Sequence, residues 1–408
     1  MEEAEKMWKN KNVWILLVGE LVAGLGLWLG IIGNLEFMQK YVPSDFMKSM
    51  ILFIGLLAGV MVGPLAGRVI DSYSKKKVLI YAGFGRTLSV LFMFLALEFE
   101  SIILMICFMI SIQISAAFYF PALQSVIPLI VEENDYIQMN GVHMNVSTIS
   151  RVAGTALGGI LLVVMDISFL YIGSMIAYIV ILATTYLLSF EEPESNKVKG
   201  TKSGSFTEII PVLKRTPVAM MALVLTFVPV LFLGGFNLMV INISETQGDA
   251  AIKGLLYTAE GVSFMIGAFF VKRITHLVEP ITLMFIFSFV ISLAHLSLFF
   301  SDVKIMSLIS FGIFGFAVGC FFPIAATIFQ TKIDKEYHGR FFSFRNMFDR
   351  IMFQVVLLGT GLFLDTIGLK YMVIVFGLIS LVAVFTFGVQ YFKIGANKRL
   401  LDNHKKVV

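Results

Sequence analysis

Charged residues are scarce in this 408-residue sequence: Asp, Glu, Lys and Arg make up 14% of it, whereas hydrophobic residues make up 58%. In a typical soluble domain, charged residues are about a quarter of the chain. The composition therefore excludes an ordinary soluble globular protein and indicates that most side chains contact lipid or other helices. We expect a polytopic membrane protein.

Cysteine and the short motifs of catalysis are also scarce. The two cysteines, Cys107 and Cys320, lie inside separate apolar runs, so no disulfide framework is expected. The sequence contains no H-E-x-x-H or Cys/His spacing typical of a metal site, and no G-x-x-x-x-G-K-[ST] phosphate loop. We expect no catalytic residue, cofactor or metal, and no nucleotide or nucleic acid as a partner. An ion gradient remains as the energy source.

What the sequence does contain is a series of apolar runs of about 20 residues, the length that a helix needs to cross roughly 30 Å of hydrocarbon. A charged, Pro/Gly/Ser-rich interval over 191–216 separates two groups of six runs and is interpreted as a cytoplasmic linker. We predict an all-α membrane protein with twelve transmembrane helices in two pseudo-symmetric six-helix bundles. The predicted parts are an N-terminal half (1–190), the linker (191–216), a C-terminal half (217–392) and a cytoplasmic tail (393–408). The predicted spans are 13–38, 47–67, 78–98, 101–131, 137–164, 169–190, 217–241, 251–271, 280–300, 304–330, 341–364 and 370–392.

The positive charges predict the orientation. With a cytoplasmic N-terminus, 22 of the 31 Lys and Arg residues fall on the inner side, five on the outer side and four within spans. Cytoplasmic loops carry an excess of Lys and Arg in membrane proteins. We therefore expect a multi-pass protein of the cytoplasmic membrane with both termini inside.

The two halves resemble each other. Two similar segments lie in the fourth span of each half. They are 116–122, which contains Phe-Tyr-Phe-Pro, and 317–323, which ends in Phe-Phe-Pro. Each is followed by a polar loop with a tyrosine and then by a span containing Asn and Arg, which are Asn145 and Arg151 in one half and Asn346 and Arg350 in the other. Internal symmetry of this kind is typical of transporters whose substrate site lies between the halves.

The segment 63–77, Gly-Pro-Leu-Ala-Gly-Arg-Val-Ile-Asp-Ser-Tyr-Ser-Lys-Lys-Lys, resembles the loop motif between the second and third spans of the major facilitator superfamily. The resemblance implies a cytoplasmic gate in which the carboxylate of Asp71 binds the N-terminus of span 11, a helix end that favours negative charge. Ser72 and Ser74 depart from the family pattern. The implied gate residues are Gly67, Asp71, Lys75, Lys76, Lys77, Gly339 and Arg340.

Two further segments resemble the drug-efflux branch of that superfamily, which includes the bacterial macrolide exporters. They are Phe120 to Gln124 with Pro128 and Asn140, and a glycine motif in span 5 similar to that of antiporters. The helix-packing glycines of that motif are Gly154, Gly158 and Gly159, with Thr155 in place of the usual proline. The resemblance implies export from the cell in exchange for an ion.

Ionisable residues inside predicted spans are the candidates for coupling or substrate binding, because burying them in a membrane is costly. Glu20 and Asn34 return to nearly the same face of span 1 and are expected to line the central cavity. Glu260 lies near the middle of span 8 and is the second carboxylate candidate. Glu36, near the outer end of span 1, and Gln113 in span 4 complete the set; Glu36 is alternatively a hydrated residue and Gln113 a bridge between helices.

The alternative for each intramembrane carboxylate is a structural ion pair. The available charge partners are Arg86, Arg151, Arg345, Asp349 and Arg350, and the sequence does not tell which of them meet. Arg86 could instead extend toward the membrane surface.

We predict a secondary active transporter, a monomer that exports an amphipathic drug or metabolite in exchange for protons by alternating access. Three alternatives remain open: a flippase for lipids or lipid-linked molecules, a nutrient symporter, and a transport-inactive scaffold or sensor, the last suggested by Ser72 and Ser74.

Overall fold

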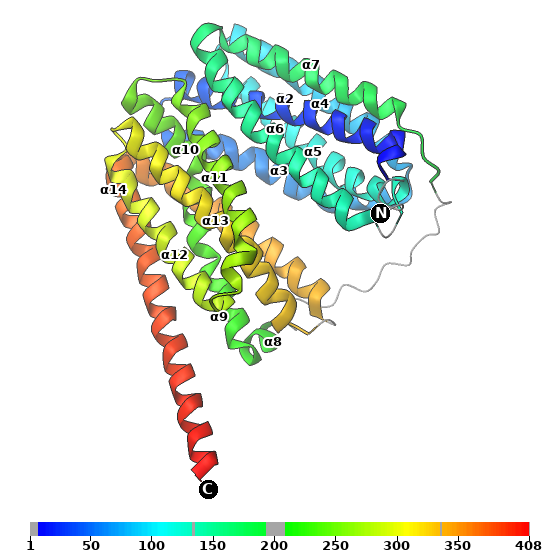
Figure 1. Cartoon of the computed structure of the whole chain (residues 1–408). Coiled ribbons are helices and arrows are strands. Elements are labelled where there is room, and N and C mark those ends of the chain that lie inside the picture. The colour runs from blue at the N-terminus through cyan, green and yellow to red at the C-terminus, as the bar shows by residue number, and fades with distance from the viewer. Residues whose placement is uncertain (1–6, 133–134, 193–208, 335–336, 408) are drawn as a thin grey trace. The chain divides into compact units, whose positions relative to one another are not determined.

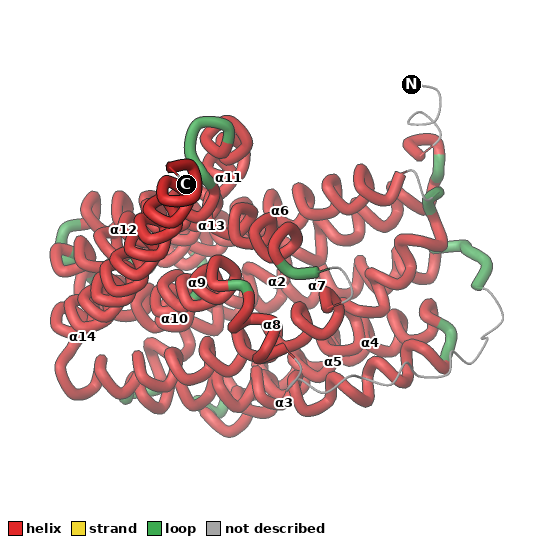
Figure 2. Tube along the Cα trace, turned by 90° about the horizontal axis from the view of Figure 1, so that it is seen from below, coloured by secondary structure: helices red, strands yellow, loops and turns green. Residues whose placement is uncertain are grey.

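The computed structural model describes residues 7–132, 135–192, 209–334 and 337–407. Throughout these ranges the chain is helical apart from short connections, and no strand occurs in them (Figure 1 and Figure 2). The all-helical prediction is confirmed. The long helices are α2 (Lys11–Tyr41), α3 (Asp45–Ser72), α4 (Lys75–Glu98), α5 (Ile102–Ile130), α6 (Tyr136–Val164), α7 (Ile167–Leu187), α10 (Phe227–Gln247), α11 (Ile252–Thr275), α12 (Pro280–Ser297), α13 (Lys304–Lys332) and α14 (His338–Val407).

Eleven helical ranges within the described residues are long and apolar enough to cross a membrane. The last of them, Phe344–Tyr391, contains two predicted spans, because α14 bends at Gly368, where φ is 75° and ψ is 170°. Glycine tolerates this positive φ because it has no Cβ. The twelve predicted spans are therefore accounted for.

Contacts between Cα atoms divide the chain into two compact units. The first unit comprises Met1–Thr201 together with Val240–Thr258, and the second comprises Lys202–Met239 and Ala259–Val408. Residues of the predicted C-terminal half, at the end of α10 and the start of α11, thus belong to the first unit by their contacts. No pattern in the sequence indicates this assignment.

In the first unit, α2 packs against α6 and α7, while α5 packs against both α3 and α4. Small residues allow the close approach of α2 and α7: a Cβ on Gly26 would lie 2.3 Å from Ala177 Cβ, and Ser174 Oγ donates to Gly26 O at 2.6 Å. In the second unit, α12 packs against α13 and α14.

Two boundaries differ from the expectation. The predicted seventh span is divided into α9 (Pro217–Leu225) and α10, since Pro229 has no N–H with which to bind the carbonyl of Leu225. Within the predicted linker, Ile209–Arg215 forms the short helix α8, in which Leu213 is buried. Residues 193–208 of that linker lie outside the described residues.

Candidate functional site

Glu20 is the centre of a polar cluster in the first unit. Its side chain projects from α2 about one third of the way along the helix, and the residue is 8% exposed. The hydroxyl of Tyr119 on α5 donates to Glu20 Oε1 at 2.5 Å. His143 Nε2 on α6 lies 3.7 Å from Glu20 Oε2, and the His143 side chain is 18% exposed. Three helices therefore contribute to one carboxylate, with a neutral donor on one side and a titratable group on the other.

Arg86 adds a positive charge to this cluster, and among the described residues it forms no ion pair with a carboxylate. It lies on α4 and is 2% exposed, so it does not extend to the membrane surface. Its guanidinium carbon lies 4.7 Å from the ring centroid of Tyr119, 4.9 Å from that of Tyr178 and 5.3 Å from that of Phe120. Aromatic faces attract cations. Arg86 and Glu20 thus share Tyr119 as a neighbour: one contacts its ring, the other its hydroxyl.

Neither Tyr119 nor His143 is among the residues that the sequence predicts for the site. Tyr119 lies in the segment repeated between the halves, which is the only signal the sequence offers for it. His143 has no local signal, because it comes from a different helix and a distant part of the chain.

Asn34 shares a face of α2 with Glu20 but lies about four turns further along, a rise of about 21 Å. Tyr171 OH donates to Asn34 Oδ1 at 2.9 Å, and Asn34 Nδ2 lies 3.8 Å from Met109 Sδ. Asn34 therefore connects α2 with α7 and α5 and is not in contact with the Glu20 cluster.

Glu36 has a buried partner. Lys253, at the start of α11, is 0% exposed, and its Nζ lies 2.8 Å from both Glu36 Oε2 and Ser244 Oγ. A second buried lysine, Lys48 on α3, contacts Asp45 at 3.0 Å and Glu245 at 3.2 Å. These ion pairs connect the ends of α2 and α3 to residues 240–258 within the first unit.

The three glycines of α6 each face a neighbouring helix closely. A Cβ on Gly154 would lie 2.8 Å from Trp28 Cβ, and one on Gly158 would lie 3.0 Å from Ile32 Cβ, so both glycines face α2. A Cβ on Gly159 would lie 2.9 Å from the Cα of Gly254 on α11. The motif therefore allows α6 to pack against two helices at once.

The remaining candidates are distributed over both units. The backbone carbonyl of Gln113 on α5 packs against Gly59 of α3. A Cβ added to Gly59 would lie 3.3 Å from Gln113 O. In the second unit, Glu260 is 4% exposed, and its backbone packs against Gly315 of α13, where an added Cβ would lie 2.2 Å from Glu260 O.

Among the intramembrane charge partners, Arg345 Nε lies 3.4 Å from Asp349 Oδ2 one turn away on α14. The guanidinium of Arg345 also lies 4.6 Å from the ring centroid of Phe329. Arg151 on α6 is half-buried and Arg350 on α14 is exposed.

The loop between α3 and α4 has a carboxylate partner that the sequence does not predict. Glu192, just after α7, accepts hydrogen bonds from Ser74 Oγ at 2.7 Å, from Lys75 N at 2.9 Å and from Lys76 N at 3.1 Å. A carboxylate at a helix N-terminus is favourable because the first N–H groups have no partner within the helix. Ser74, which departs from the family pattern, is the N-cap of α4.

Glu192 lies outside the membrane-spanning helices, and its pKa reflects these contacts. Partial burial by itself would raise the pKa, but the hydrogen bonds from Ser74, Lys75 and Lys76 outweigh it, and the pKa of Glu192 lies below its ordinary value. Lys76 Nζ donates in addition to the carbonyls of Leu188 at 2.6 Å and Tyr186 at 3.0 Å. The start of α4 is thereby held to the end of α7.

For three of the predicted gate residues only the backbone is described. Asp71 lies in the last turn of α3, and Gly339 and Arg340 lie in the first turn of α14; their side chains lie outside the described residues. Gly67 is exposed on α3. Within the described residues, no three His, Cys, Asp or Glu side chains lie together in a way that could hold a metal ion.

Comparison with known proteins identifies the family. The model of the Major Facilitator Superfamily matches residues 16–353 and also 231–406. The chain belongs to the major facilitator superfamily. The predicted resemblance is confirmed, and with it the assignment to a family of transporters with twelve membrane helices.

Relatives in this family include Macrolide efflux protein A of Streptococcus pyogenes, which is 25% identical over 393 residues, covering 89% of this chain and 92% of the relative. Macrolide efflux protein A of Enterococcus faecalis is 26% identical over 317 residues, covering 71% and 92%. Among solved structures, the nucleoside transporter NupG superposes with a TM-score of 0.71 at 14% identity, covering 93% of this chain and 99% of that one. A bacterial homologue of the iron transporter ferroportin, in an inward-facing state, gives a TM-score of 0.69 at 15% identity, with coverage of 92% and 98%. The last two share the fold with this superfamily member.

Proposed function

We propose that this superfamily transporter exports amphipathic compounds in exchange for protons, with Glu20 as the proton acceptor. The observation that carries the proposal is the contact of the buried Glu20 carboxylate with Tyr119 and its proximity to His143. An ionised carboxylate at this depth is costly unless it is paired. Protonation of Glu20 removes that charge, and so a proton taken up there changes the interactions among α2, α5 and α6.

The neighbouring imidazole supports this role. Glu20 is 8% exposed, and His143, whose side chain is 18% exposed, lies beside it. Histidine is the side chain whose ordinary titration range includes physiological pH. A proton exchanged between His143 Nε2 and Glu20 Oε2 would move across a separation of 3.7 Å. The hydrogen bond from the Tyr119 hydroxyl fixes the position of the Glu20 carboxylate during this exchange.

The direction of transport is supported by the relatives named for macrolide efflux and by the glycines of α6. Both termini are assigned to the cytoplasm because most Lys and Arg residues then lie inside. Moving one elementary charge across 100 mV releases about 2.3 kcal/mol, and a tenfold solute gradient requires about 1.4 kcal/mol. One proton suffices for more than tenfold export of a neutral compound. We assign Glu260 as a second acceptor in the other unit, on its burial alone.

The experiment is uptake of a cationic fluorescent dye by energised inverted membrane vesicles containing wild type, Glu20→Gln or Glu98→Gln. The exposed Glu98 at the end of α4 loses the same charge and is the matched control. We expect uptake that a protonophore abolishes, a loss of at least tenfold in Glu20→Gln, and no change in Glu98→Gln. Protonophore-resistant uptake, or full activity in Glu20→Gln, would contradict the assignment.

The same vesicles distinguish the alternatives. Counterflow of any solute by purified protein excludes a transport-inactive scaffold, and movement that requires a lipid substrate indicates a flippase. Dye uptake by vesicles of the opposite orientation would indicate a symporter.

A further inference from the structure

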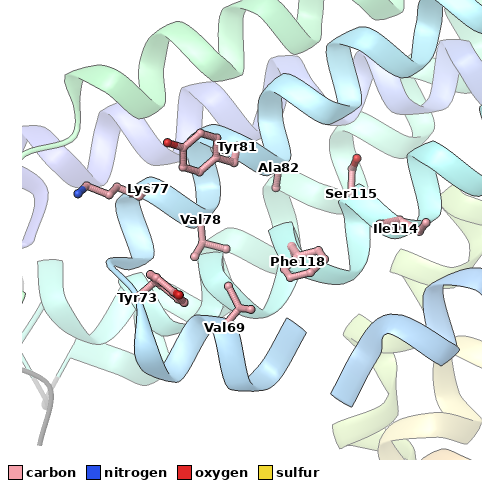
Figure 3. A pocket seen from close by; sticks show the side chains of 9 residues that line it. All are labelled: Val69, Tyr73, Lys77, Val78, Tyr81, Ala82, Ile114, Ser115 and Phe118. Carbon is pink, nitrogen blue, oxygen red and sulfur yellow. The ribbon is translucent and has the colours of Figure 1, made fainter. Parts of the chain in front are cut away.

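A cavity of about 600 Å³ in the first unit takes no part in the Glu20 cluster. It lies between α3 and α4, and α5 forms its floor; Figure 3 shows Tyr73 and Lys77 at one end and Ile114 and Ser115 at the other. Its lining is mostly apolar, with Val69, Val78 and Phe118 in the middle. The cavity exists because α3 and α4 each pack closely on α5 but have few contacts with one another.

The floor is held by small residues. A Cβ on Gly85 of α4 would lie 2.6 Å from Ser115 Oγ of α5, and one on Gly59 of α3 would lie 3.3 Å from Gln113 O. α5 therefore approaches both helices closely while the space above it stays open. This volume is within the range of sites for small ligands.

The helix surfaces beside the cavity are apolar and exposed, which is expected of surfaces that contact lipid. On α4, the exposed residues recur every three or four positions and so form one face. They are Tyr81, Phe84, Leu88, Leu91 and Leu95. On α3, Met61 and Leu65 are exposed in the same way. An acyl chain of the surrounding bilayer can therefore enter the cavity without crossing a polar surface.

The end of the cavity near the α3–α4 connection is polar and positively charged. Lys77 is exposed, and no hydrogen bond or ion pair holds its ammonium within the described part of the chain. Its neighbour Lys76, in contrast, is held by two carbonyls. Tyr73 and Tyr81 are 66% and 74% exposed beside Lys77. Tyrosine is enriched at the level of lipid headgroups, and cations near the membrane surface attract anionic lipids.

We propose that this cavity binds one anionic phospholipid, with its phosphate on Lys77 and an acyl chain between α3 and α4. The free ammonium disfavours a cationic amphiphile at the same place, because like charges repel. The apolar middle disfavours a free inorganic phosphate. The proposal concerns a lipid bound to the protein and is independent of the compound that is transported.

The test is native mass spectrometry of the purified full-length protein, titrated with phosphatidylglycerol or phosphatidylcholine carrying the same acyl chains. We expect wild type to retain one phosphatidylglycerol with about fivefold preference, the factor expected for one cation near an anionic headgroup. Lys77→Gln should abolish the preference. Lys214→Gln, which removes an exposed cation on α8, should leave it unchanged. Val69→Trp, which fills the middle of the cavity, should reduce retention of both lipids at least threefold, whereas Leu91→Trp on the exposed face of α4 should not.

Three results would overturn the proposal. Unchanged retention in both Lys77→Gln and Val69→Trp would show that the cavity holds no lipid. Loss of both lipids in Val69→Trp with no headgroup preference in wild type would show an apolar site that does not recognise charge. Displacement of phosphatidylglycerol by a cationic dye, with tighter dye binding in Lys77→Gln, would indicate an entry site for the transported compound instead.

Discussion

The hydroxyl of Tyr119 donates a hydrogen bond of 2.5 Å to Glu20 Oε1, although 99 positions separate the two residues in the chain. Tyr119 is 1% exposed, so water cannot easily replace it as a donor. A buried acceptor that loses a hydrogen-bond donor carries a desolvation penalty. The position and charge of Glu20 therefore depend on a residue of another helix.

Tyr119→Phe should reduce proton-driven transport about tenfold, because the ring that contacts Arg86 remains while the donor to Glu20 is lost. A hydrogen bond to a charged group contributes about 1.5–3 kcal/mol. Tyr178→Phe is the matched control, since Tyr178 is equally buried and also has its ring beside Arg86. Rates of dye uptake in inverted vesicles measure the effect. Equal activity in the two variants would show that the Tyr119 hydroxyl is dispensable.

Lys253→Met should destabilise the protein by about 3 kcal/mol, because it leaves Glu36 without its partner. Adding Glu36→Gln should recover part of the loss, since the unpaired charge is then removed as well. Lys370→Met is the control: Lys370 and Asp302 form an ion pair whose side chains are each 47% exposed, and such pairs contribute at most about 1 kcal/mol. Thermal unfolding of the purified protein in detergent measures the three variants and the wild type. An unaltered midpoint in Lys253→Met contradicts the prediction.

Gly159→Val should separate α6 from α11, because a Cβ at this position lies 2.9 Å from Gly254 Cα and 3.0 Å from Ala251 O. Overpacking of this kind costs about 1–3 kcal/mol. Gly141→Val on the same helix serves as the control, since an added Cβ there has no neighbour within 4 Å. The readout is the unfolding midpoint of the purified protein in detergent. A midpoint that does not change in Gly159→Val would show that the two helices tolerate the added side chain.

The hydrogen bonds from Lys75 N and Lys76 N to Glu192 should persist at neutral pH and disappear in acid. Because the pKa of Glu192 is lowered in the folded protein, its contribution to stability is fully present above the ordinary value of 4.5 and is lost as the pH falls through the lower folded value. Hydrogen exchange of a peptide that includes these amides, corrected for the intrinsic pH dependence, measures this loss.

Glu192→Gln should remove the pH dependence of that exchange. The start of α5 is an internal control, because its N-cap is the hydroxyl of Ser101, which does not titrate in this range. Amide protection at Lys75 and Lys76 that is unchanged between pH 7 and pH 3 would exclude Glu192 as the cap.

Hydropathy and charge located the helices because both are properties of short stretches of sequence. A span must be about 20 residues long and apolar whatever its neighbours are, and Glu20 stands out in such a span without knowledge of its partners. The loop motif and the repeat between the halves were readable for the same reason, and the comparisons confirm the family that they indicate.

The contact partners of individual charged residues could not be predicted from short stretches of sequence. Lys253 is counted as an outer-side cation from the sequence, yet it is buried against Glu36, more than 200 positions away. Glu192 belongs to a segment that composition assigns to a linker, yet it caps α4. In both cases the contact depends on how helices cross, which one-dimensional patterns do not contain.

The sequence by itself determined that this chain crosses a membrane as two sets of six helices, because the cost of exposing polar backbone and charge to lipid leaves few alternatives. It also determined that Glu20 lies within the membrane. Only the tertiary structure decided that Glu20 contacts Tyr119 and lies beside His143, that Arg86 lies among three aromatic rings, and that a cavity between α3 and α4 ends at Lys77. Those arrangements follow from side-chain packing between helices that are distant in the chain, where small residues such as Gly26 and Gly85 set how closely each pair approaches.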